Sequence, residues 1–357
     1  MAHKPQLDSL RAIAILIVIA HHFLLREFPF AGFGAILFLV LSGYFGTRSL
    51  LKLREDREAG RKTLGGALRS FHTHRVLRIV PVYWLLIVIT AIAGVEFARQ
   101  NFWSNLFFQT NLTMLETGEW PGRFSHFWSL SVLEQFYLLW PVVFLCIPRR
   151  KQFWAIFTLI LLGPVYRVFA WSHDAMFMEW VGVPFAWSDA LGMGALLAWA
   201  EPRAQKRRLV RIGAICAGVV FFEEMSRPMG LIMPVFALWL PLVASLGFVW
   251  LIEKAKEGFK GFTGAILSNT WLTKLGKISY GMFLYHNFVE LLWPKWNWVQ
   301  ALLAGPQRIL ILLPSTVAIA WCSWTWIEAP LTRWRKGRRE KAEVLINIVC
   351  PTAGKFA

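Results

Sequence analysis

Arg11 and His22 are the residues that most clearly call for a chemical explanation, because both belong to a strongly apolar segment. Every residue from Ala12 to Ala20 is apolar. If this segment is helical, Arg11 and His22 lie within ~20° of each other on one face and roughly 16 Å apart along the axis, while His21 points ~80° away. A cation and an imidazole inside such a helix are costly unless they face polar surroundings. We therefore predict that this face meets a polar cavity.

Arg75 and Arg78 form a second candidate, at the start of another apolar segment. Three residues apart on a helix, they share one face and could clamp an anion such as a phosphate. Basic residues at a cytoplasmic helix end also fix the orientation of a membrane protein. Their spacing alone leaves both interpretations open.

Four further polar residues lie within apolar segments. Ser131 and Glu134 would share a helix face, and Glu134 would serve either as a functional partner of a His or Arg, which we favour, or in a structural ion pair. Asp189 could bind substrate or pair with a buried Arg. His286 could be a catalyst or a hydrogen-bonding bridge between helices. The sequence shows no metal-ligand spacing, P-loop or dinucleotide-binding fingerprint.

The composition indicates an all-helical, multi-pass membrane protein. The 357 residues are 56% hydrophobic and include 20 Trp and 29 Phe, too much apolar surface for one soluble core. The formal charge of +17 comes from basic residues between the apolar segments, a pattern that favours membrane topology over nucleic-acid binding. The four cysteines form no C-x-x-C pair and do not resemble a disulfide framework.

We predict about ten transmembrane helices, with both termini in the cytoplasm. With this topology, 30 Lys and Arg residues fall in inside segments and 7 in outside segments. A transmembrane domain would cover residues 1–335, and a basic tail, 336–357, would suit anionic lipids of the inner leaflet. The predicted helices start near Leu10, Gly32, Val76, Phe127, Gln152, Phe185, Leu209, Leu231, Ile278 and Arg308.

Several motifs together resemble the membrane-bound acyltransferase 3 family. The opening LDSLRAIAILIVIAHH carries the family's Arg and His separated by ten residues, here Arg11 and His22. The other motifs follow in the family's order: LFLVLSGYF, Arg75-x-x-Arg78 before IVPVYW, FWSLSVLEQFYLLWP, SDALGMGALLA, ISYGMFLYHN and WIEAPL. Two positions depart from the pattern: Ile36 replaces a common Asp, and the acid of the fourth motif is displaced to Glu134 by Leu133.

The resemblance implies an O-acyltransferase of a bacterial inner membrane, which moves an acyl group, commonly acetyl, to a hydroxyl of a cell-surface glycan or another sugar-containing acceptor. Acyl-coenzyme A would be the donor substrate, with no permanently bound cofactor. His22, Arg11 and Glu134 would then be catalytic, with His22 as general base or as a transient acyl carrier. The substrate-binding residues would be Arg75, Arg78, Ser131, Asp189 and His286. The alternative is a transporter or flippase, in which the same charges line a polar pathway.

Overall fold

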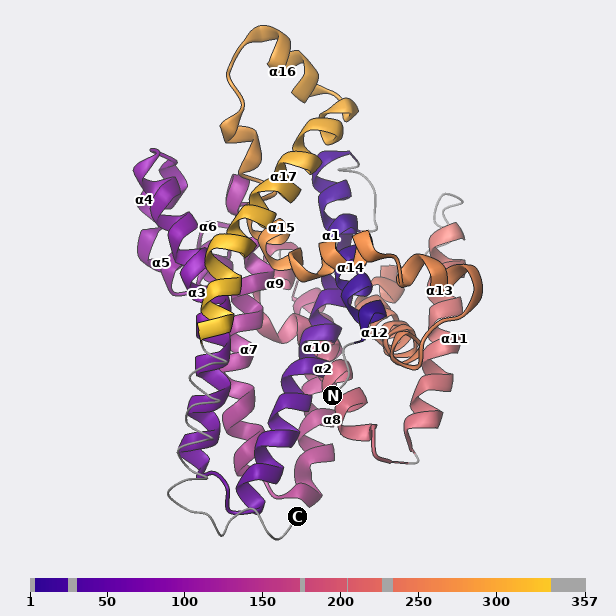
Figure 1. Ribbon diagram of the computed structural model, residues 1–357. Coiled ribbons are helices and arrows are strands. Elements are labelled where there is room, and N and C mark those ends of the chain that lie inside the picture. Colours follow the sequence, from indigo (N-terminus) through magenta and orange to yellow (C-terminus); the bar gives the residue numbers. More distant parts are fainter. Residues whose placement is uncertain (1–3, 25–30, 174–176, 204, 227–233, 335–357) are drawn as a thin grey trace.

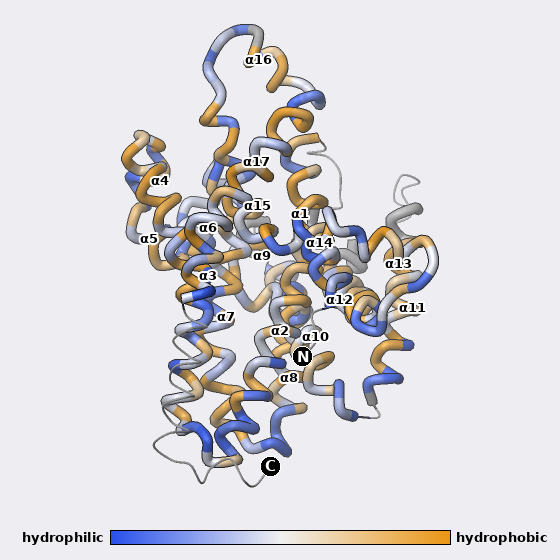
Figure 2. Tube along the Cα trace, viewed as in Figure 1, coloured by the Kyte–Doolittle hydropathy of each residue, from blue (hydrophilic) through white to orange (hydrophobic). Residues whose placement is uncertain are grey.

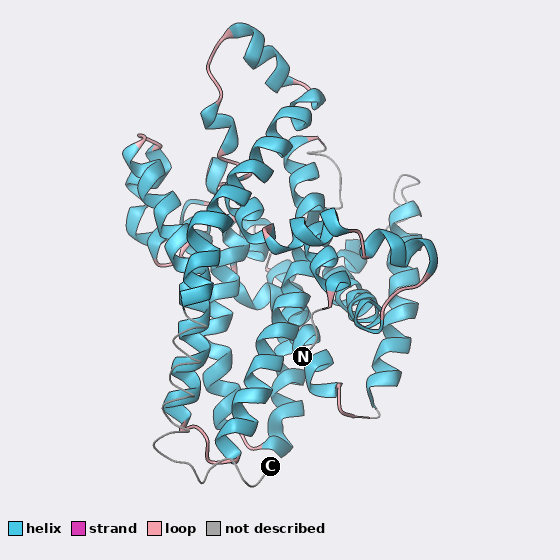
Figure 3. Ribbon diagram, viewed as in Figure 1, coloured by secondary structure: helices cyan, strands magenta, loops and turns pink. Residues whose placement is uncertain are grey.

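The computed structural model describes residues 4–24, 31–173, 177–203, 205–226 and 234–334. All regular elements in these ranges are helices, and no strand occurs in them (Figure 3). The all-helical class predicted from the sequence is therefore confirmed. The basic tail, residues 336–357, lies outside the described residues.

The helices fall into two groups by length (Figure 1). The longer ones are α1 (Pro5–Phe23), α2 (Ala31–Glu58), α3 (Leu64–Ile92), α7 (Phe127–Cys146), α8 (Gln152–Ser172), α10 (Ser188–Ala200), α11 (Gln205–Ser226), α12 (Pro234–Glu257) and α17 (Ile309–Ser323) with a π-helical turn (Trp324–Glu328). The short ones are α4 (Glu96–Gln100), α5 (Phe102–Leu106), α6 (Thr110–Thr117), α9 (Phe177–Gly182), α13 (Gly261–Leu267), α14 (Thr270–Lys277), α15 (Ser279–Tyr285) and α16 (Asn297–Ala304).

The protein is a multi-pass membrane protein. Seven helical segments of the described chain are long and apolar enough to cross a bilayer: Pro5–Phe23, Gly32–Glu58, Leu64–Ile92, Phe127–Cys146, Arg149–Ser172, Leu238–Glu257 and Pro306–Trp334. A helix lies at or next to nine of the ten predicted positions; the tenth, near Leu231, lies outside the described residues, and α12 is described from Pro234. Of these helices, α10, α11 and α15 are too short or too polar to count among the seven. α10 has 13 residues, α15 has 7, and the 22 residues of α11 include charges near both ends.

Three helices connect the two halves of the apolar core. α1, α3 and α7 each contribute buried residues to two clusters, one shared with α2, α8, α10 and α12 and the other with α15 and α17. In α1, Leu10 belongs to the first cluster and Ile19 to the second. Since Arg11 and His22 lie on this helix, its two ends enter different surroundings.

α2 and α10 cross with their backbones in contact. A Cβ atom added at Gly43 would clash with the backbone of Leu191, and one added at Gly194 would clash with the backbone of Val40. Only glycine permits this approach, as at other crossings built on small residues. The contact fixes the position of α2, which lines the cavities described below.

Polar contacts join the ends of neighbouring helices at two places in the bundle. Arg149, just before α8, pairs with Glu58 at the end of α2 at 2.5 Å, and Arg57 donates to the carbonyl of Leu145 near the end of α7 at 2.6 Å. Figure 2 shows hydrophilic residues along this lower end of the long helices. The second place is the C-terminal end of α1, where Arg308 donates to the carbonyls of His22 (2.8 Å) and Phe23 (2.6 Å).

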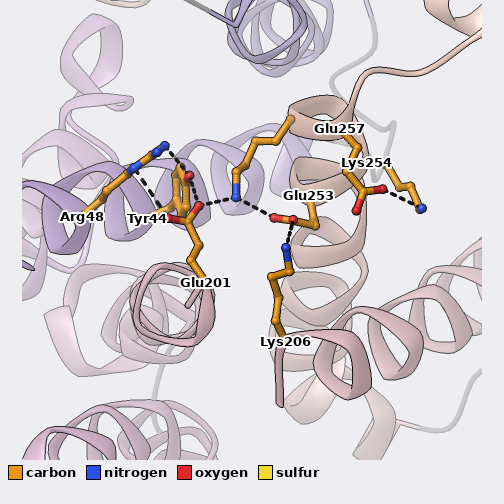
Figure 4. Close-up of polar contacts among 8 residues, drawn as sticks. Tyr44, Arg48, Glu201, Lys206, Glu253, Lys254 and Glu257 are labelled. Carbon is orange, nitrogen blue, oxygen red and sulfur yellow. Dashed lines mark hydrogen bonds and ion pairs between the residues drawn. The ribbon is translucent and has the colours of Figure 1, made fainter. Parts of the chain in front are cut away.

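An ion network links α2 and α10 to α11 and α12 (Figure 4). The hydroxyl of Tyr44 donates to Glu201 at 2.6 Å, and Lys256 bridges Glu201 and Glu253. Lys206 of α11 also pairs with Glu253, at 2.8 Å. Each of these two carboxylates therefore has more than one partner, and the network holds the pair of helices α11 and α12 against the rest of the bundle.

Candidate active site

The first cavity, which we call the arginine cavity, has a volume of about 160 Å³ and lies among α1, α2, α3, α7 and α15. Arg11, Arg75, Arg78 and His74 contribute to its wall, and no acidic residue is among the described residues that line it. The structure thus brings together three arginines that the sequence had singled out in two separate motifs. Such a concentration of positive charge favours an anionic ligand.

Aromatic side chains support two of these arginines. The guanidinium of Arg75 lies over the ring of Tyr137, and that of Arg11 lies 4.4 Å from the ring centroid of Phe45. Tyr137 is itself fixed, since its hydroxyl donates to the carbonyl of Ser42 at 2.8 Å. Arg11 also pairs with Asp8 at 3.0 Å. These contacts orient the planar guanidinium groups before any ligand binds.

A second cavity of about 420 Å³ continues from the arginine cavity toward α14 and α17. Arg11, His74 and Arg78 line both spaces, and Lys277 and Glu328 line only the second. One carboxylate oxygen of Glu328, Oε1, is buried and has no hydrogen-bond partner among the described residues. This second space, which we call the mouth cavity, provides room for the larger part of an anionic ligand.

The third cavity, the histidine cavity, measures about 400 Å³ and is lined by His21, His22 and His126. The ring centroid of His286 lies 5.0 Å from that of His22 and 4.5 Å from that of His126. Since both His21 and His22 line the cavity, it covers more of α1 than the single face predicted from helical periodicity. His22 thus begins a series of ring contacts that continues through His286 to His126.

The hydrogen bonds of the two inner histidines differ. Both ring nitrogens of His126 are engaged, Nε2 with the carbonyl of Leu284 at 3.4 Å and Nδ1 with the side-chain amide of Asn287 at 3.0 Å. Nδ1 of His286 lies 2.7 Å from the carbonyl oxygen of Phe283, which can only accept, so Nδ1 carries the hydrogen. Its Nε2 is buried with no partner among the described residues. In its neutral form, the ring of His286 therefore offers a basic nitrogen close to His22.

The arginine and histidine cavities share part of their walls. Phe38 of α2, Ser129 of α7 and Phe283 of α15 line both. The rings of Phe38 and Phe283 are nearly parallel, with an interplanar angle of 7° and centroids 6.1 Å apart. The anion-attracting space and the imidazole-lined space are thus adjacent, on the two sides of these three residues.

Four predicted site residues lie outside both walls: His286, which contacts the histidine cavity only through the ring of His22, and Ser131, Glu134 and Asp189. Ser131 is fully buried, and its hydroxyl has no partner among the described residues. Glu134 interacts electrostatically with Arg75, behind the cavity surface, and its Oε1 is buried without a hydrogen-bond partner in the described part of the chain. Asp189 forms a buried ion pair with Arg167 at 2.6 Å, the structural alternative considered for it above.

A sequence profile of the acyltransferase domain matches residues 4–325. The chain belongs to this acyltransferase family. The match includes every residue that lines the arginine and histidine cavities. The acyltransferase resemblance inferred from separate motifs is therefore confirmed across most of the chain.

Named relatives of this acyltransferase include the peptidoglycan O-acetyltransferase OatA of Listeria monocytogenes, 31% identical over 163 residues (40% of this chain, 24% of the relative). The putative peptidoglycan O-acetyltransferase YrhL of Bacillus subtilis is 26% identical over 328 residues (79% and 48%). A putative O-acetyltransferase of Staphylococcus aureus is 30% identical over 196 residues (49% and 31%). The chain spans less than half the length of these relatives, and no solved structure matches it.

Sequence reasoning missed several residues that line the cavities of this acyltransferase. His126 directly precedes the motif FWSLSV, and Glu328 lies inside the motif WIEAPL. Both are ionisable groups next to or within apolar segments, so the rule that selected His286 could have selected them too. Ser129, two residues before Ser131, had no comparable signal, because only the packing of α7 shows which of the two hydroxyls faces a cavity.

Proposed function

We propose that this chain is an O-acyltransferase of a bacterial inner membrane, which moves an acyl group from acyl-coenzyme A to a hydroxyl of a cell-surface glycan. The observation that supports this most strongly is the shared wall between a cationic cavity and a histidine-lined cavity. This arrangement separates donor binding from base catalysis in space. The names of the relatives support acetyl as the acyl group and a sugar-containing acceptor.

The proposal includes ten passes through the membrane, with α10, α11 and α15 as shorter or more polar passes, and both termini in the cytoplasm. The predicted cytoplasmic loops next to α2, α7 and α8 meet through Glu58, Arg57 and Arg149. The segments predicted outside also meet, through Arg308 and through the pair of Arg123 with Glu290 at 2.9 Å. The contacts among the predicted cytoplasmic loops and those among the segments predicted outside agree with the orientation that the distribution of Lys and Arg indicates.

Acyl-coenzyme A would enter from the cytoplasm through the mouth cavity. Arg78 and Arg11 line both the mouth and the arginine cavity, and Arg75 lies deeper. Planar guanidinium groups bind phosphate through two parallel hydrogen bonds, which suits the phosphates of coenzyme A. Glu134, near Arg75, would keep this guanidinium in place instead of contacting the acceptor. The acyl thioester would then point toward Phe38 and Phe283.

The acceptor hydroxyl would approach from the histidine cavity. His22 is the proposed general base, since an imidazole titrates close to neutral pH. The hydroxyl oxygen attacks the thioester carbonyl, a C–O bond forms and the C–S bond breaks. The hydroxyl proton passes to His22 and then to the thiolate of coenzyme A, so the products are an ester and the free thiol.

The test uses the full-length protein in lipid nanodiscs with acetyl-coenzyme A labelled in the acetyl group and soluble peptidoglycan fragments. We expect label in the glycan, released by mild alkali as an ester is, and ~100- to 10,000-fold slower labelling with His22→Ala. Labelled glycan formed equally by protein and protein-free nanodiscs would contradict the proposal. Glycan uptake into sealed vesicles without any acetyl transfer would instead indicate the transporter.

A further inference from the structure

The three residues that separate the arginine and histidine cavities are two aromatic residues and one serine, and none of them carries a charge. Of the three shared residues, Phe38 and Phe283 present aromatic rings. The third, Ser129, donates its hydroxyl hydrogen to the carbonyl of His126 at 3.0 Å. The shared wall between the cavities is therefore made of two rings and a hydroxyl whose hydrogen is already engaged.

We propose that Phe38, Ser129 and Phe283 form a constriction that selects the length of the acyl group, admitting acetyl and rejecting longer chains. This inference rests on the proposed function, because it concerns the group that crosses from the donor cavity to His22. It also specifies the donor as a short-chain acyl thioester. The basic lining of the arginine cavity does not determine the length of the acyl chain.

The backbone that carries Phe38 and the side chain of Phe283 are both held from behind. Phe38 lies on α2, whose backbone contacts α10 at Gly43 and Gly194. Phe283 is 8% exposed, its ring centroid lies 5.1 Å from that of His126, and its carbonyl accepts the bond from His286. A wall made of packed aromatic rings yields to a longer chain less readily than flexible aliphatic residues do.

The position of the constriction also matters for the reaction. Phe283 belongs to the same turn of chain as His286, which contacts His22. An acyl group longer than the passage would keep its carbonyl on the arginine side, away from the imidazole. Misplacement of this kind lowers the rate of transfer much more than it lowers donor affinity.

The experiment compares acetyl- and butyryl-coenzyme A as donors for the protein in nanodiscs, with transfer to peptidoglycan fragments as readout. We expect the unaltered protein to favour acetyl strongly. Phe38→Ala should raise the ratio of butyryl to acetyl transfer by about 10-fold or more, since one methylene group in a fitted pocket changes selectivity by roughly 10- to 200-fold. Phe283→Ala should act in the same direction, with a lower overall rate because of its contact with His126.

Phe33→Ala is the matched control. Phe33 lies on the same helix as Phe38, but it lines a separate apolar groove and contacts Phe248, with ring centroids 6.5 Å apart. Its loss should leave the donor ratio unchanged. Phe38→Leu provides a milder variant if Phe38→Ala does not fold, and it should shift the ratio in the same direction by a smaller factor.

The outcomes separate this inference from the proposed function. Acetyl transfer by the unaltered protein, with donor ratios in the Phe38 and Phe283 variants equal to that of Phe33→Ala, would overturn the constriction alone. The same conclusion would follow if the unaltered protein used butyryl as well as acetyl. Absence of any transfer by the unaltered protein would overturn both.

Discussion

The two sides of the helical bundle treat buried charge in opposite ways. On the side of α8, α10, α11 and α12, carboxylates and cations satisfy one another: Asp189 with Arg167, and Glu201 and Glu253 with Lys206 and Lys256. On the side of α1, α3, α7, α15 and α17, charged and imidazole groups face cavities, and several buried polar atoms have no hydrogen-bond partner in the described chain.

This difference shows how a structural charge can be separated from a functional one in a membrane protein. A charge inside an apolar helix is costly unless something compensates it. A complete set of partner groups compensates it without any functional role. Asp189 looks as suggestive in the sequence as Arg75 does, and only its full pairing with Arg167 distinguishes it. Unsatisfied groups beside a cavity are the ones available to a ligand. The predictions below test this distinction.

The largest effect is expected for His22 in the histidine cavity. His22→Ala should reduce acyl transfer by ~100- to 10,000-fold, the usual contribution of a general base, with little change in acyl-coenzyme A binding. His21→Ala removes the neighbouring imidazole and leaves the contact between His22 and His286 in place, so it should lose much less. The measurement is the acyl-transfer rate of the two purified variants, compared at equal folded concentration. An inactive His21→Ala beside an active His22→Ala would reverse the assignment.

The paired side predicts loss of stability instead of activity. Asp189→Asn leaves Arg167 buried without its counter-charge, which should lower the free energy of unfolding by about 3–5 kcal/mol. Thermal unfolding in detergent measures this, with Glu257→Gln as control, since Glu257 belongs to an exposed pair with Lys254 that contributes at most about 1 kcal/mol. Transfer per folded molecule should stay within a factor of about two. A stable but inactive Asp189→Asn would restore the substrate-binding role.

Arg75 and Arg78 test whether the open side binds the donor. Lys keeps the charge that favours insertion but lacks the planar guanidinium group. Arg75→Lys and Arg78→Lys should therefore insert normally and bind acyl-coenzyme A about 10- to 100-fold more weakly, as expected for loss of charge-assisted hydrogen bonds. Equilibrium binding to nanodiscs is the measurement. Arg57→Lys, outside the cavities, should bind the donor normally, and equal affinity in all three variants would leave only the topological role.

The smallest effect is expected for His286, a positioning residue behind His22. Asn in its place can still donate to the carbonyl of Phe283 but lacks the second ring nitrogen. We expect His286→Asn to lower kcat about 10-fold, to leave KM for acyl-coenzyme A unchanged and to alter the pH–rate profile. His173→Asn, an exposed control directly after α8, should change neither. A raised KM with an unaltered pH profile would assign His286 to substrate binding.

Much of the fold could be predicted because its signals are local. Most of the predicted apolar segments are helical, and Arg11 and His22 both line cavities, although two different ones. Periodicity placed His21 on another face, yet it lines the same cavity as His22. The lengths of α10 and α15 could not be predicted in this way. The apolar residues around Phe185 and Ile278 continue beyond the helices that form, so the hydropathy pattern alone does not show where those helices end.

The site was less predictable because it depends on contacts between distant residues. Asp189 and Arg167 are separated by 22 positions and His126 and His286 by 160, and no local rule joins either pair. Arg11, Arg75 and Arg78 were identified separately, but their meeting in one cavity depends on how α1 and α3 pack. The shared wall of Phe38, Ser129 and Phe283 carries no ionisable group and had no signal at all.

The glycine contact between α2 and α10 has a consequence for motion. Because the two backbones touch at Gly43 and Gly194, neither helix can slide or turn past the other without breaking the crossing, and α2 forms a stationary wall for both cavities. The opposite wall includes α15, a helix of only 7 residues, and beyond it the π-helical turn of Trp324–Glu328, a type of turn that interrupts regular helical hydrogen bonding. A substrate that needs more room must therefore gain it by displacing Phe283, while Phe38 stays in place.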